Sequence, residues 1–470
     1  MKANSDHNED QMRAERLNRR QFLHLSALVG GALLAACAPP AAPQQPAAGG
    51  TGSTEGVTTI SWWNGYSTDS VKQVAPQIIS DFEAQNPNIK VEYEISGGPP
   101  GGGQLMEVLL SRIAGGTPPD SVTIWTAPSE FGAQGALLEL DDMMESARLA
   151  KPDAFYEGPL NSCRWNGKTY GLPASAGAGC MFLNMEKFAA KGIDVSRDNF
   201  PGTWDELKAM SAEFVVYEGD TLREVGFVPW ADSWLKPVWS GLNGGKIYDA
   251  ANNQYVIDSP ENIGWWEYMV GWLDEQYRGD LEALNVAGAW ASVYPESAFH
   301  MGLSAMASEG SWACTDVEFP FEWEIVKFPV GPSGTKSVTG YWPNWWALPK
   351  GCPHPSEAFL FSEYFCTEGW VTWYKVIFDT PAWREFPTDV VTQKLIDIVG
   401  PEEAQAIHNW FADYLNDTVD MWNSPIESFA SDTLNAAIGE IMFKTKTPAE
   451  ALAEAQQRCQ AHLEETLRGA

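Results

Sequence analysis

The first part of the folded chain alternates between two hydrophobic periods. Residues 58–63 and 121–125 are apolar runs typical of strands, and residues 89–95 alternate between apolar and polar positions. Between these segments, apolar residues recur at helical spacing in 71–82 and again in 105–113. The order strand, helix, strand, helix, strand predicts a largely parallel sheet with helices on its faces.

Helical patterns dominate the rest of the chain. Residues 203–206 (TWDE) form a capping box, which predicts a helix through Phe214. Residues 447–450 (TPAE) form a second capping box, which opens the terminal helix. Residues 325–328 and 345–348 are predicted strands, and we find no internal repeat. The whole pattern predicts an α/β protein.

The N-terminal segment, residues 1–36, predicts a signal peptide. Its apolar run, residues 25–36, has 12 residues, whereas a membrane-spanning helix needs about 20. Arg19 and Arg20 precede this run in the sequence NRRQFLH, which resembles the twin-arginine export motif. That motif directs proteins that fold before export.

Cys37 is the predicted site of lipidation. It ends the sequence LAAC, which resembles a lipobox, where cleavage frees the cysteine for acylation. The alternative is an ordinary secretory leader with an incidental cysteine. Residues 37–56 are mainly Pro, Ala, Gly, Gln, Ser and Thr, which predicts a flexible tether. We therefore expect an extracytoplasmic protein that is held at the membrane by its lipid anchor only.

Length and charge narrow the class of protein. The chain has 470 residues, which is too long for one small module, and its 44% hydrophobic content is that of a globular protein. Acidic residues outnumber basic residues by 62 to 30, so the formal net charge is −32. A surface this acidic repels phosphate backbones, so we expect no nucleic-acid partner.

The six cysteines after Cys37 are widely spaced and include no C-x-x-C pair, which disfavours a zinc site. Export permits disulfides, and Cys163 with Cys180 and Cys352 with Cys366 are the pairs nearest in sequence. The sequence equally allows the alternative that all six cysteines are buried free thiols.

Motifs for catalysis are missing from the sequence. It contains no G-x-S-x-G elbow, H-E-x-x-H, P-loop, G-x-G-x-x-G or D-x-D-x-D-G calcium loop. Acidic groups such as Asp141 with Asp142, or Glu318 with Glu322 and Glu324, are the type of residue that glycosidases use. In so acidic a chain, solvated surface is the commoner explanation. We assign no catalytic residue, no metal ligand and no cofactor.

Tryptophan supplies the candidate binding chemistry, because 22 of them exceed what core packing needs. An indole stacks on the apolar C–H face of a pyranose, while polar neighbours bond the sugar hydroxyls. Trp63 and Trp125 end two predicted strands, where open α/β sheets place their ligand crevice, and the loop 340–344 suits a cleft wall. The alternative is burial in the core, which the helical setting of Trp265 and Trp266 favours. The candidate ligand-binding residues are Trp62, Trp63, Asn64, Trp125, Trp230, Trp239, Trp312, Tyr341, Trp342, Trp345 and Trp383.

Several stretches along the chain together carry a family resemblance. They are PDSVTIW at 119–125 with 131–138, WNGKTYGLP at 165–173 with 182–184, MASEGSW at 306–312, WALPK at 346–350 with 357–358, and 447–456. In this order and spacing they resemble extracellular solute-binding proteins of the carbohydrate-uptake group, akin to maltose-binding proteins. The resemblance covers most of residues 57–470.

The resemblance implies a two-lobed periplasmic-binding-protein fold of type II. Each lobe would be a mainly parallel sheet flanked by helices, with the ligand cleft at the hinge. The implied N-terminal lobe is 57–175 plus 329–378, and the C-terminal lobe is 176–328 plus 379–470. Hinge crossings are expected near 174–177, 328–330 and 378–383.

The resemblance also implies roles for two tryptophans. Trp125 matches the strand-end aromatic beside the sugar, and Trp312 matches the aromatic that faces the cleft. The charged residues that often follow the first position are replaced by residues 127–129 (APS), with only Glu130 nearby. This departure argues against a maltose-like ligand, but not against the class.

The implied function is the substrate-binding component of an ABC importer. It would be a monomer that captures a neutral sugar or oligosaccharide and delivers it to the transmembrane permease subunits. One alternative is a secreted glycoside hydrolase, favoured by the abundant carboxylates. Another is a binding protein for a non-sugar solute such as a polyol phosphate, which would need Arg or Lys at the cleft.

Overall fold

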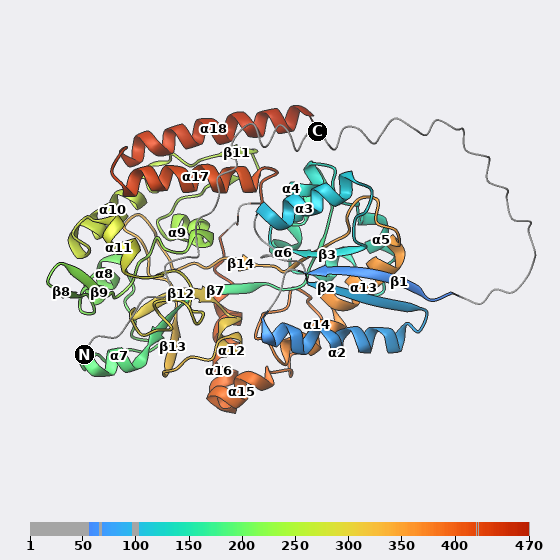
Figure 1. Ribbon diagram of the computed structural model, residues 1–470, viewed down its shortest axis with the longest axis horizontal. Coiled ribbons are helices and arrows are strands. Elements are labelled where there is room, and N and C mark those ends of the chain that lie inside the picture. The colour runs from blue at the N-terminus through green and yellow to red at the C-terminus, as the bar shows by residue number, and fades with distance from the viewer. Residues whose placement is uncertain (1–55, 65–67, 96–102, 420, 422, 470) are drawn as a thin grey trace, which may run out of the picture. The chain divides into compact units, whose positions relative to one another are not determined.

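The computed structural model describes residues 56–64, 68–95, 103–419, 421 and 423–469. Arg19, Arg20 and Cys37, with the signal peptide and nearly all of the tether, lie outside the described residues. The described residues belong to one compact unit (Figure 1). Within them, no helix combines the length and the apolar character that crossing a membrane requires.

The first sheet has five strands in the order β2-β1-β3-β15-β6. β1 pairs in parallel with β2 and β3, whereas β15 is antiparallel to both β3 and β6. The strands are β1 Thr58–Asn64, β2 Ile89–Ile95, β3 Ser121–Ile124, β6 Leu172–Pro173 and β15 Trp345–Ala347. The predicted start of the fold is confirmed, because β1, α2, β2, α3 and β3 follow one another as the hydrophobic periods indicate.

The second sheet has the order β12-β7-β13, and β14 also pairs with β7. These strands are β7 Gly177–Asn184, β12 Met306–Gly310, β13 Trp323–Val326 and β14 Tyr341–Trp342. Each partner of β7 is antiparallel to it, so the prediction of a mainly parallel sheet is wrong for this lobe. The strand–helix alternation that indicates parallel pairing occurs only before residue 125. A long segment of helices and two hairpins separates β7 from β12.

Short hairpins and helices complete the fold. The hairpin strands are β4 Arg164–Trp165, β5 Lys168–Thr169, β8 Val216–Glu218, β9 Thr221–Glu224, β10 Tyr248–Asp249 and β11 Gln254–Tyr255. The helices are α2 Asp69–Gln85, α3 Gly103–Ala114, α4 Pro128–Ala133, α5 Asp141–Ser146, α6 Glu157–Asn161, α7 Met185–Lys191, α8 Trp204–Ala212, α9 Lys236–Leu242, α10 Pro260–Gln276, α11 Leu281–Ala287, α12 Ala313–Asp316, α13 Pro355–Cys366, α14 Glu368–Tyr374, α15 Gln393–Val399, α16 Pro401–Tyr414, α17 Glu427–Met442 and α18 Pro448–Gly469, with 3-10 turns η1 Pro152–Ala154 and η2 Ser233–Leu235.

Both predicted capping boxes form. At α8, the Thr203 side chain accepts from the Glu206 N–H, and the Glu206 carboxylate accepts from the Thr203 N–H. Thr447 and Glu450 make the same reciprocal pair at the start of α18. α18 then packs along α17 (Figure 1).

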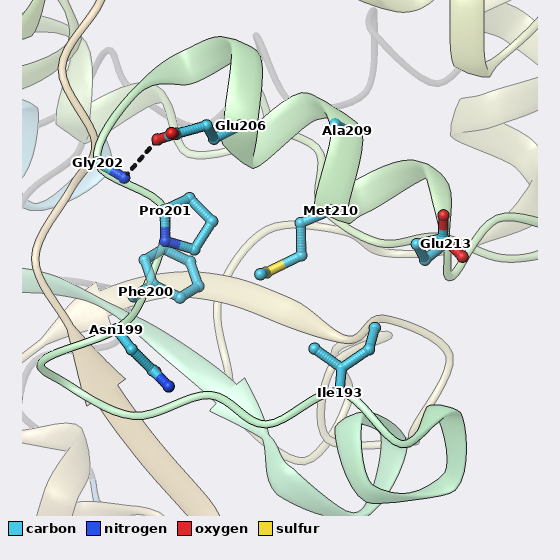
Figure 2. Close-up of a pocket in the computed structure, with 9 residues that line it drawn as sticks. All are labelled: Ile193, Asn199, Phe200, Pro201, Gly202, Glu206, Ala209, Met210 and Glu213. Carbon is cyan, nitrogen blue, oxygen red and sulfur yellow. Dashed lines mark hydrogen bonds between the residues drawn. The ribbon is translucent and has the colours of Figure 1, made fainter.

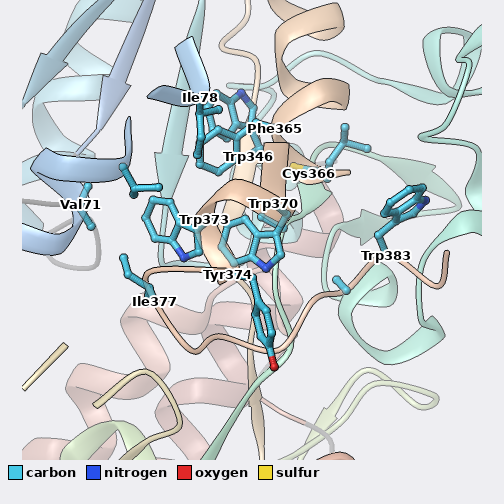
Figure 3. Close-up of a cluster of buried hydrophobic side chains, with 14 of the residues drawn as sticks. Val71, Ile78, Trp346, Phe365, Cys366, Trp370, Trp373, Tyr374, Ile377 and Trp383 are labelled. Carbon is cyan, nitrogen blue, oxygen red and sulfur yellow. The ribbon is translucent and has the colours of Figure 1, made fainter. Parts of the chain in front are cut away.

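Tryptophans fill much of the core. One large cluster contains Trp62 of β1, Trp346 of β15 and Trp370 of α14. The Trp62 and Trp346 rings stack with centroids 4.9 Å apart, and Trp370 stacks on Trp373 at 5.0 Å. Figure 3 shows Trp346, Trp370, Trp373 and Trp383 in this buried layer. Packing of this density explains many of the 22 tryptophans without a ligand.

The chain passes between the two sheets more than once. It leaves β6 at Pro173, and β7 begins at Gly177; it returns between Trp342 of β14 and Trp345 of β15. Ser175 lies opposite Pro381 in an isolated antiparallel bridge, which brings the predicted crossings 174–177 and 378–383 together. Val330 lies beside Thr203. The lobe boundaries and hinge positions stay predictions.

Candidate functional site

The end of β1 is buried. The Trp62 indole is fully buried and donates to the Thr123 hydroxyl at 2.8 Å. Trp63 is buried on the opposite face of the sheet, where the Arg112 guanidinium lies 5.1 Å from its ring centroid. Asn64 is also fully buried, and its amide donates to the Tyr93 hydroxyl at 3.3 Å. These three candidates therefore pack around the first sheet instead of facing solvent.

Five further candidate aromatics belong to hydrophobic clusters. Trp239 is buried in the second core between Trp204 and Phe328. Trp345 is buried and donates to the Ser162 hydroxyl at 2.7 Å. Trp230, half-buried, packs on the second core, and Trp383 is buried in the first. Tyr341 is buried beside Ala176 and Met421.

Trp312 and Trp342 meet through a third indole, that of Trp234. The Trp234 ring meets Trp342 edge-to-face with centroids 4.4 Å apart, and its centroid is 5.9 Å from that of Trp312. All three side chains are half-buried, so each keeps part of its surface open to solvent. They come from η2, from the turn after β12 and from β14. We call Trp234, Trp312 and Trp342 the tryptophan cluster.

Glycines let two of these indoles lie against the backbone of β7 and β12. A Cβ added at Gly177 would lie 2.9 Å from the Trp312 ring, and one added at Gly310 would lie 2.2 Å from it. A Cβ at Gly179 would lie 3.0 Å from the Trp342 ring. Any larger residue would therefore displace an indole, and the glycines fix where the cluster stands.

A chain of hydrogen bonds links Trp125 to polar residues next to the tryptophan cluster. Its side chain is 43% exposed, the most open of the candidate aromatics, and it donates to the Asn344 side-chain oxygen at 3.1 Å. The Asn344 amide nitrogen donates to Asp379 Oδ2 at 2.7 Å and to the Ser175 hydroxyl at 3.1 Å. Ser175 also accepts from the Asn344 backbone N–H at 3.1 Å. Residues from four separate segments of the chain thus share one polar network.

Two buried carboxyl groups, those of Asp232 and Glu309, lie beside the cluster, where they accept hydrogen bonds from Trp234 and Trp312. Ser292 donates its backbone N–H to Asp232 Oδ1 at 3.0 Å and its hydroxyl to Glu309 Oε2 at 3.1 Å. Ser292 holds this position with φ of 70°, in the left-handed region that a non-glycine residue occupies at a cost.

Burial raises the pKa values of the three carboxyl groups near the cluster, those of Asp379, Glu309 and Asp232. It raises the pKa of Asp379 to about 8, against the opposing hydrogen bonds from Ser175 and Asn344. It raises the pKa of Glu309 to about 7, against hydrogen bonds that include one from the Trp312 side chain. For Asp232, burial and then the nearby Glu309 raise the pKa well above the ordinary value. The site therefore holds protons that an exposed carboxyl would have lost at neutral pH.

Sequence reasoning missed the polar half of this site. Asp232, Ser292, Glu309, Asn344 and Asp379 were not among the candidates, although 340–344 and 378–383 were singled out as a cleft wall and a hinge. Nothing in the linear sequence marks a carboxyl that becomes buried only when distant segments meet.

The six described cysteines are all unpaired and buried. Of the two alternatives, disulfides and free thiols, the structure therefore has free thiols. Burial raises the pKa of the Cys352 thiol to about 12.

A separate surface pocket lies at the start of α8, away from the tryptophan cluster. Ile193, Phe200, Pro201 and Met210 supply its apolar lining, and the Glu206 carboxylate at its edge accepts from the Gly202 N–H at 2.9 Å (Figure 2). Because Glu206 is engaged in capping, the pocket offers mostly apolar surface.

Known proteins resemble the chain over most of its length. A multiple sugar-binding protein of Streptococcus mutans is 25% identical over 350 residues, which cover 71% of this chain and 75% of the relative. An uncharacterised ABC transporter extracellular-binding protein of Pyrococcus horikoshii is 25% identical over 320 residues, 65% of this chain and 67% of the relative. A putative binding protein of Brucella abortus is 34% identical, but the match spans about half of each chain, 48%.

Solved structures share the fold. The mannobiose-bound protein CpMnBP1 has a TM-score of 0.70 at 22% identity, covering 85% of this chain and 99% of its own. The maltose-bound MalE3 of T. maritima has a TM-score of 0.66 at 19% identity, covering 85% and 98%. These neighbours confirm the two-lobed α/β fold of type II. Residues 64–372 match the bacterial extracellular solute-binding proteins, and the chain therefore belongs to that family.

Proposed function

We propose that this protein is the extracytoplasmic substrate-binding component of an ABC importer, and that it captures a sugar or oligosaccharide at the tryptophan cluster. The observation that carries the proposal is the meeting of three half-buried indoles, Trp234, Trp312 and Trp342, with the buried polar groups of Asn344 and Asp379. Relatives named for multiple sugars and for arabinooligosaccharides support the ligand class.

The chemistry of the site suits a sugar ring. Indole faces remove apolar C–H surface from water, while the Asn344 amide and the Asp379 carboxyl are suited to bond hydroxyls. From the original candidates, we retain Trp125, Trp312 and Trp342 as ligand contacts, and we add Trp234. Trp62, Trp63, Asn64, Trp230, Trp239, Tyr341, Trp345 and Trp383 then serve to support the two lobes.

Capture works by population shift. A ligand that contacts both lobes binds the closed arrangement better than the open one, so it raises the closed fraction. The closed form is then recognised by the transmembrane permease subunits. The protein acts as a monomer, without a cofactor and without converting its ligand.

The leader motifs at Arg19, Arg20 and Cys37 support a proposal for how the protein is exported and anchored. We propose that Cys37 carries the lipid anchor and that the tether gives the binding domain reach toward the permease. Membrane fractionation of cells that express Cys37→Ala tests this anchor. The variant should move to the soluble extracytoplasmic fraction, and retention in the membrane would contradict lipidation.

The binding proposal is tested by calorimetry and by intrinsic tryptophan fluorescence with a panel of mono- and oligosaccharides. At least one saccharide should bind, and Trp312→Ala should weaken its binding by about fivefold or more, because burying one indole face against the sugar is worth about 1–3 kcal/mol. Trp323→Ala, which alters a half-buried indole away from the cluster, is the control. Chromatography of the sugar after incubation with the protein should show that it is unchanged. Hydrolysis of the sugar would favour the hydrolase alternative.

A further inference from the structure

Glu130, the charged residue that follows Trp125 most closely in the sequence, makes a long-range contact instead of facing solvent. It lies on α4 and is 5% exposed. Its Oε2 atom accepts from the Ser428 backbone N–H at 3.0 Å and from the Ser428 hydroxyl at 3.0 Å. Ser428 is the second residue of α17 and is 298 residues away along the chain. The contact therefore joins two helices that are distant in sequence.

Through this contact, Glu130 caps α17. The first N–H groups of a helix have no partner within the helix, and Ile426, the residue before α17, makes no side-chain capping bond. The Glu130 carboxyl accepts from one of these N–H groups, that of Ser428. In the opposite direction, the Glu427 carboxyl of α17 accepts from the backbone N–H of Ala127, the residue before α4. The starts of the two helices are thus held together by an acid from each side.

The two helices belong to different hydrophobic clusters. Ala127 and Phe131 pack in a cluster that contains residues of the first sheet, among them Val122 of β3. Ile426 and Ala430 pack in the second core, which contains residues of β7. By the predicted lobe boundaries, α4 lies in the N-terminal lobe and α17 in the C-terminal lobe. Separation of the lobes would therefore break the contact between Glu130 and α17.

Acidic groups dominate the surroundings of Glu130. Asp432 lies one turn further along α17 and opposes ionisation of Glu130, and Glu427 lies beside Ser428. The Lys236 ammonium of α9 is near Asp432, but its hydrogen bond goes to a backbone carbonyl, that of residue 233, at 2.5 Å. In the described part of the chain, Glu130 has no ion-pair partner, and both of its printed donors belong to an uncharged residue.

The other titratable side chains beside the two helices contact different residues. They are Arg164, which donates to Asn161, Tyr170, whose ring lies against Gly132, and His462 and Arg458, which lie against the Phe429 ring. A buried carboxyl without a cation holds its proton more tightly than an exposed one. Burial raises the pKa of Glu130 to about 7, against the two Ser428 hydrogen bonds and with a smaller contribution from Asp432.

We propose that Glu130 is a positioning residue for lobe closure, which caps α17 as the neutral acid, so that closing takes up a proton from solvent. This inference rests on the lobe movement of the proposed function and adds a dependence on pH to it. In the open arrangement α17 no longer covers Glu130, so the carboxyl returns to its ordinary pKa of 4.5 and releases the proton. Closure is therefore favoured most below about pH 4.5, and this effect is lost as pH rises through 7.

Energy transfer between two dyes measures the ratio of closed to open protein without a sugar. The dyes are attached through Glu145→Cys on α5 and Glu465→Cys on α18, both exposed, in the full Cys37→Ala chain, whose described cysteines are buried. From pH 8 to pH 5.5 the ratio should rise by about tenfold or more. The same titration is repeated with maltose and with mannobiose.

Three variants separate the latch from other titrating groups. Glu130→Gln keeps an acceptor for Ser428 but has no proton to exchange, so it should lose most of the pH dependence and stay closed at pH 8. Ser428→Ala removes one donor at an exposed position and should lower the closed-to-open ratio by about fivefold at low pH. Glu282→Gln, exposed on α11, should behave like the labelled parent chain.

The outcomes are decisive for Glu130. A closed-to-open ratio that is constant with pH, or that rises with pH, overturns the inference. The same pH dependence in the parent chain and in Glu130→Gln, with thermal unfolding showing both folded, also overturns it. The sugar-free titration does not depend on a ligand, so a chain that closes with acid but binds no saccharide in calorimetry would contradict sugar capture and leave the role of Glu130 standing.

Discussion

The indole N–H of Trp125 donates to the side-chain oxygen of Asn344 at 3.1 Å, across a sequence separation of 219 residues. The same Asn344 side chain donates from its nitrogen to Asp379 Oδ2 at 2.7 Å. One amide therefore fixes both the most exposed candidate indole and the buried Asp379 carboxyl. The orientation of the amide is set by its need to accept from one neighbour and donate to the other.

Asn344→Ala should weaken binding of the best saccharide by about tenfold, because a net hydrogen bond is worth about 1 kcal/mol and a charged one more. Asn344→Asp should be at least as damaging, since a carboxyl in place of the amide loses the N–H that donates to Asp379 Oδ2. Calorimetry measures both. Asn409→Ala, in an exposed amide pair on α16, should bind like the unaltered protein; equal losses at both positions would contradict the role of Asn344.

Trp62→Ala should destabilise the fold by about 3–5 kcal/mol, the usual cost of removing a large aromatic from a core. The ring is fully buried, stacks on Trp346 and donates to Thr123. Chemical denaturation measures the free energy of unfolding. Trp342→Ala removes a half-buried ring of the cluster. Compared with Trp62→Ala, it should lower the free energy of unfolding less and weaken saccharide binding more. The reverse ranking would show that Trp62 belongs to the site.

Asp379→Asn should change how stability depends on pH. The folded-state pKa is about 8, well above the ordinary value of 3.8, so the folded protein holds a proton that the unfolded chain releases. Stability from this group is complete below about pH 4 and is lost as pH rises toward 8, by about 1.4 kcal/mol per pH unit. The Asp379→Asn variant lacks this loss. Its free energy of unfolding, relative to that of the unaltered protein, should therefore rise with pH, by about 2–5 kcal/mol near pH 8.

Urea denaturation of the sugar-free protein at pH 5, 6, 7 and 8 gives these differences. Glu309 and Asp232 titrate in both proteins and cancel in the comparison. Asp153→Asn, at an exposed position, is the control. A constant difference across the pH series would show that Asp379 is ionised throughout.

The six described cysteines should not react with a thiol reagent in the folded protein. All are buried and unpaired, and burial raises the pKa of Cys459 to about 11, so little thiolate forms at neutral pH. In denaturant without reductant, six thiols should react at the rate of a free thiol. Fewer than six would reveal a disulfide, and mass spectrometry after digestion would identify the pair.

Local elements were predictable because they depend on neighbours in sequence. The capping boxes at Thr203 and Thr447 formed as expected, since each needs only residues within one turn. The strand and helix spans between Thr58 and Ile124 follow the hydrophobic period closely. The direction of pairing in the second sheet was not predictable, because the long segment between β7 and β12 carries no signal for how its ends return.

By itself the sequence determined the α/β class, the start of the fold, the two-lobed family and the excess of aromatic side chains. It could not say which tryptophans face a ligand, because Trp62 and Trp312 differ only in what lies against them. Only the tertiary structure separated the fully buried Trp62 ring from the half-buried cluster and brought Asp379 to Gly177 and Trp312. Burial and charge pairing depend on segments hundreds of residues apart, so these properties of the site exist only once the chain has folded.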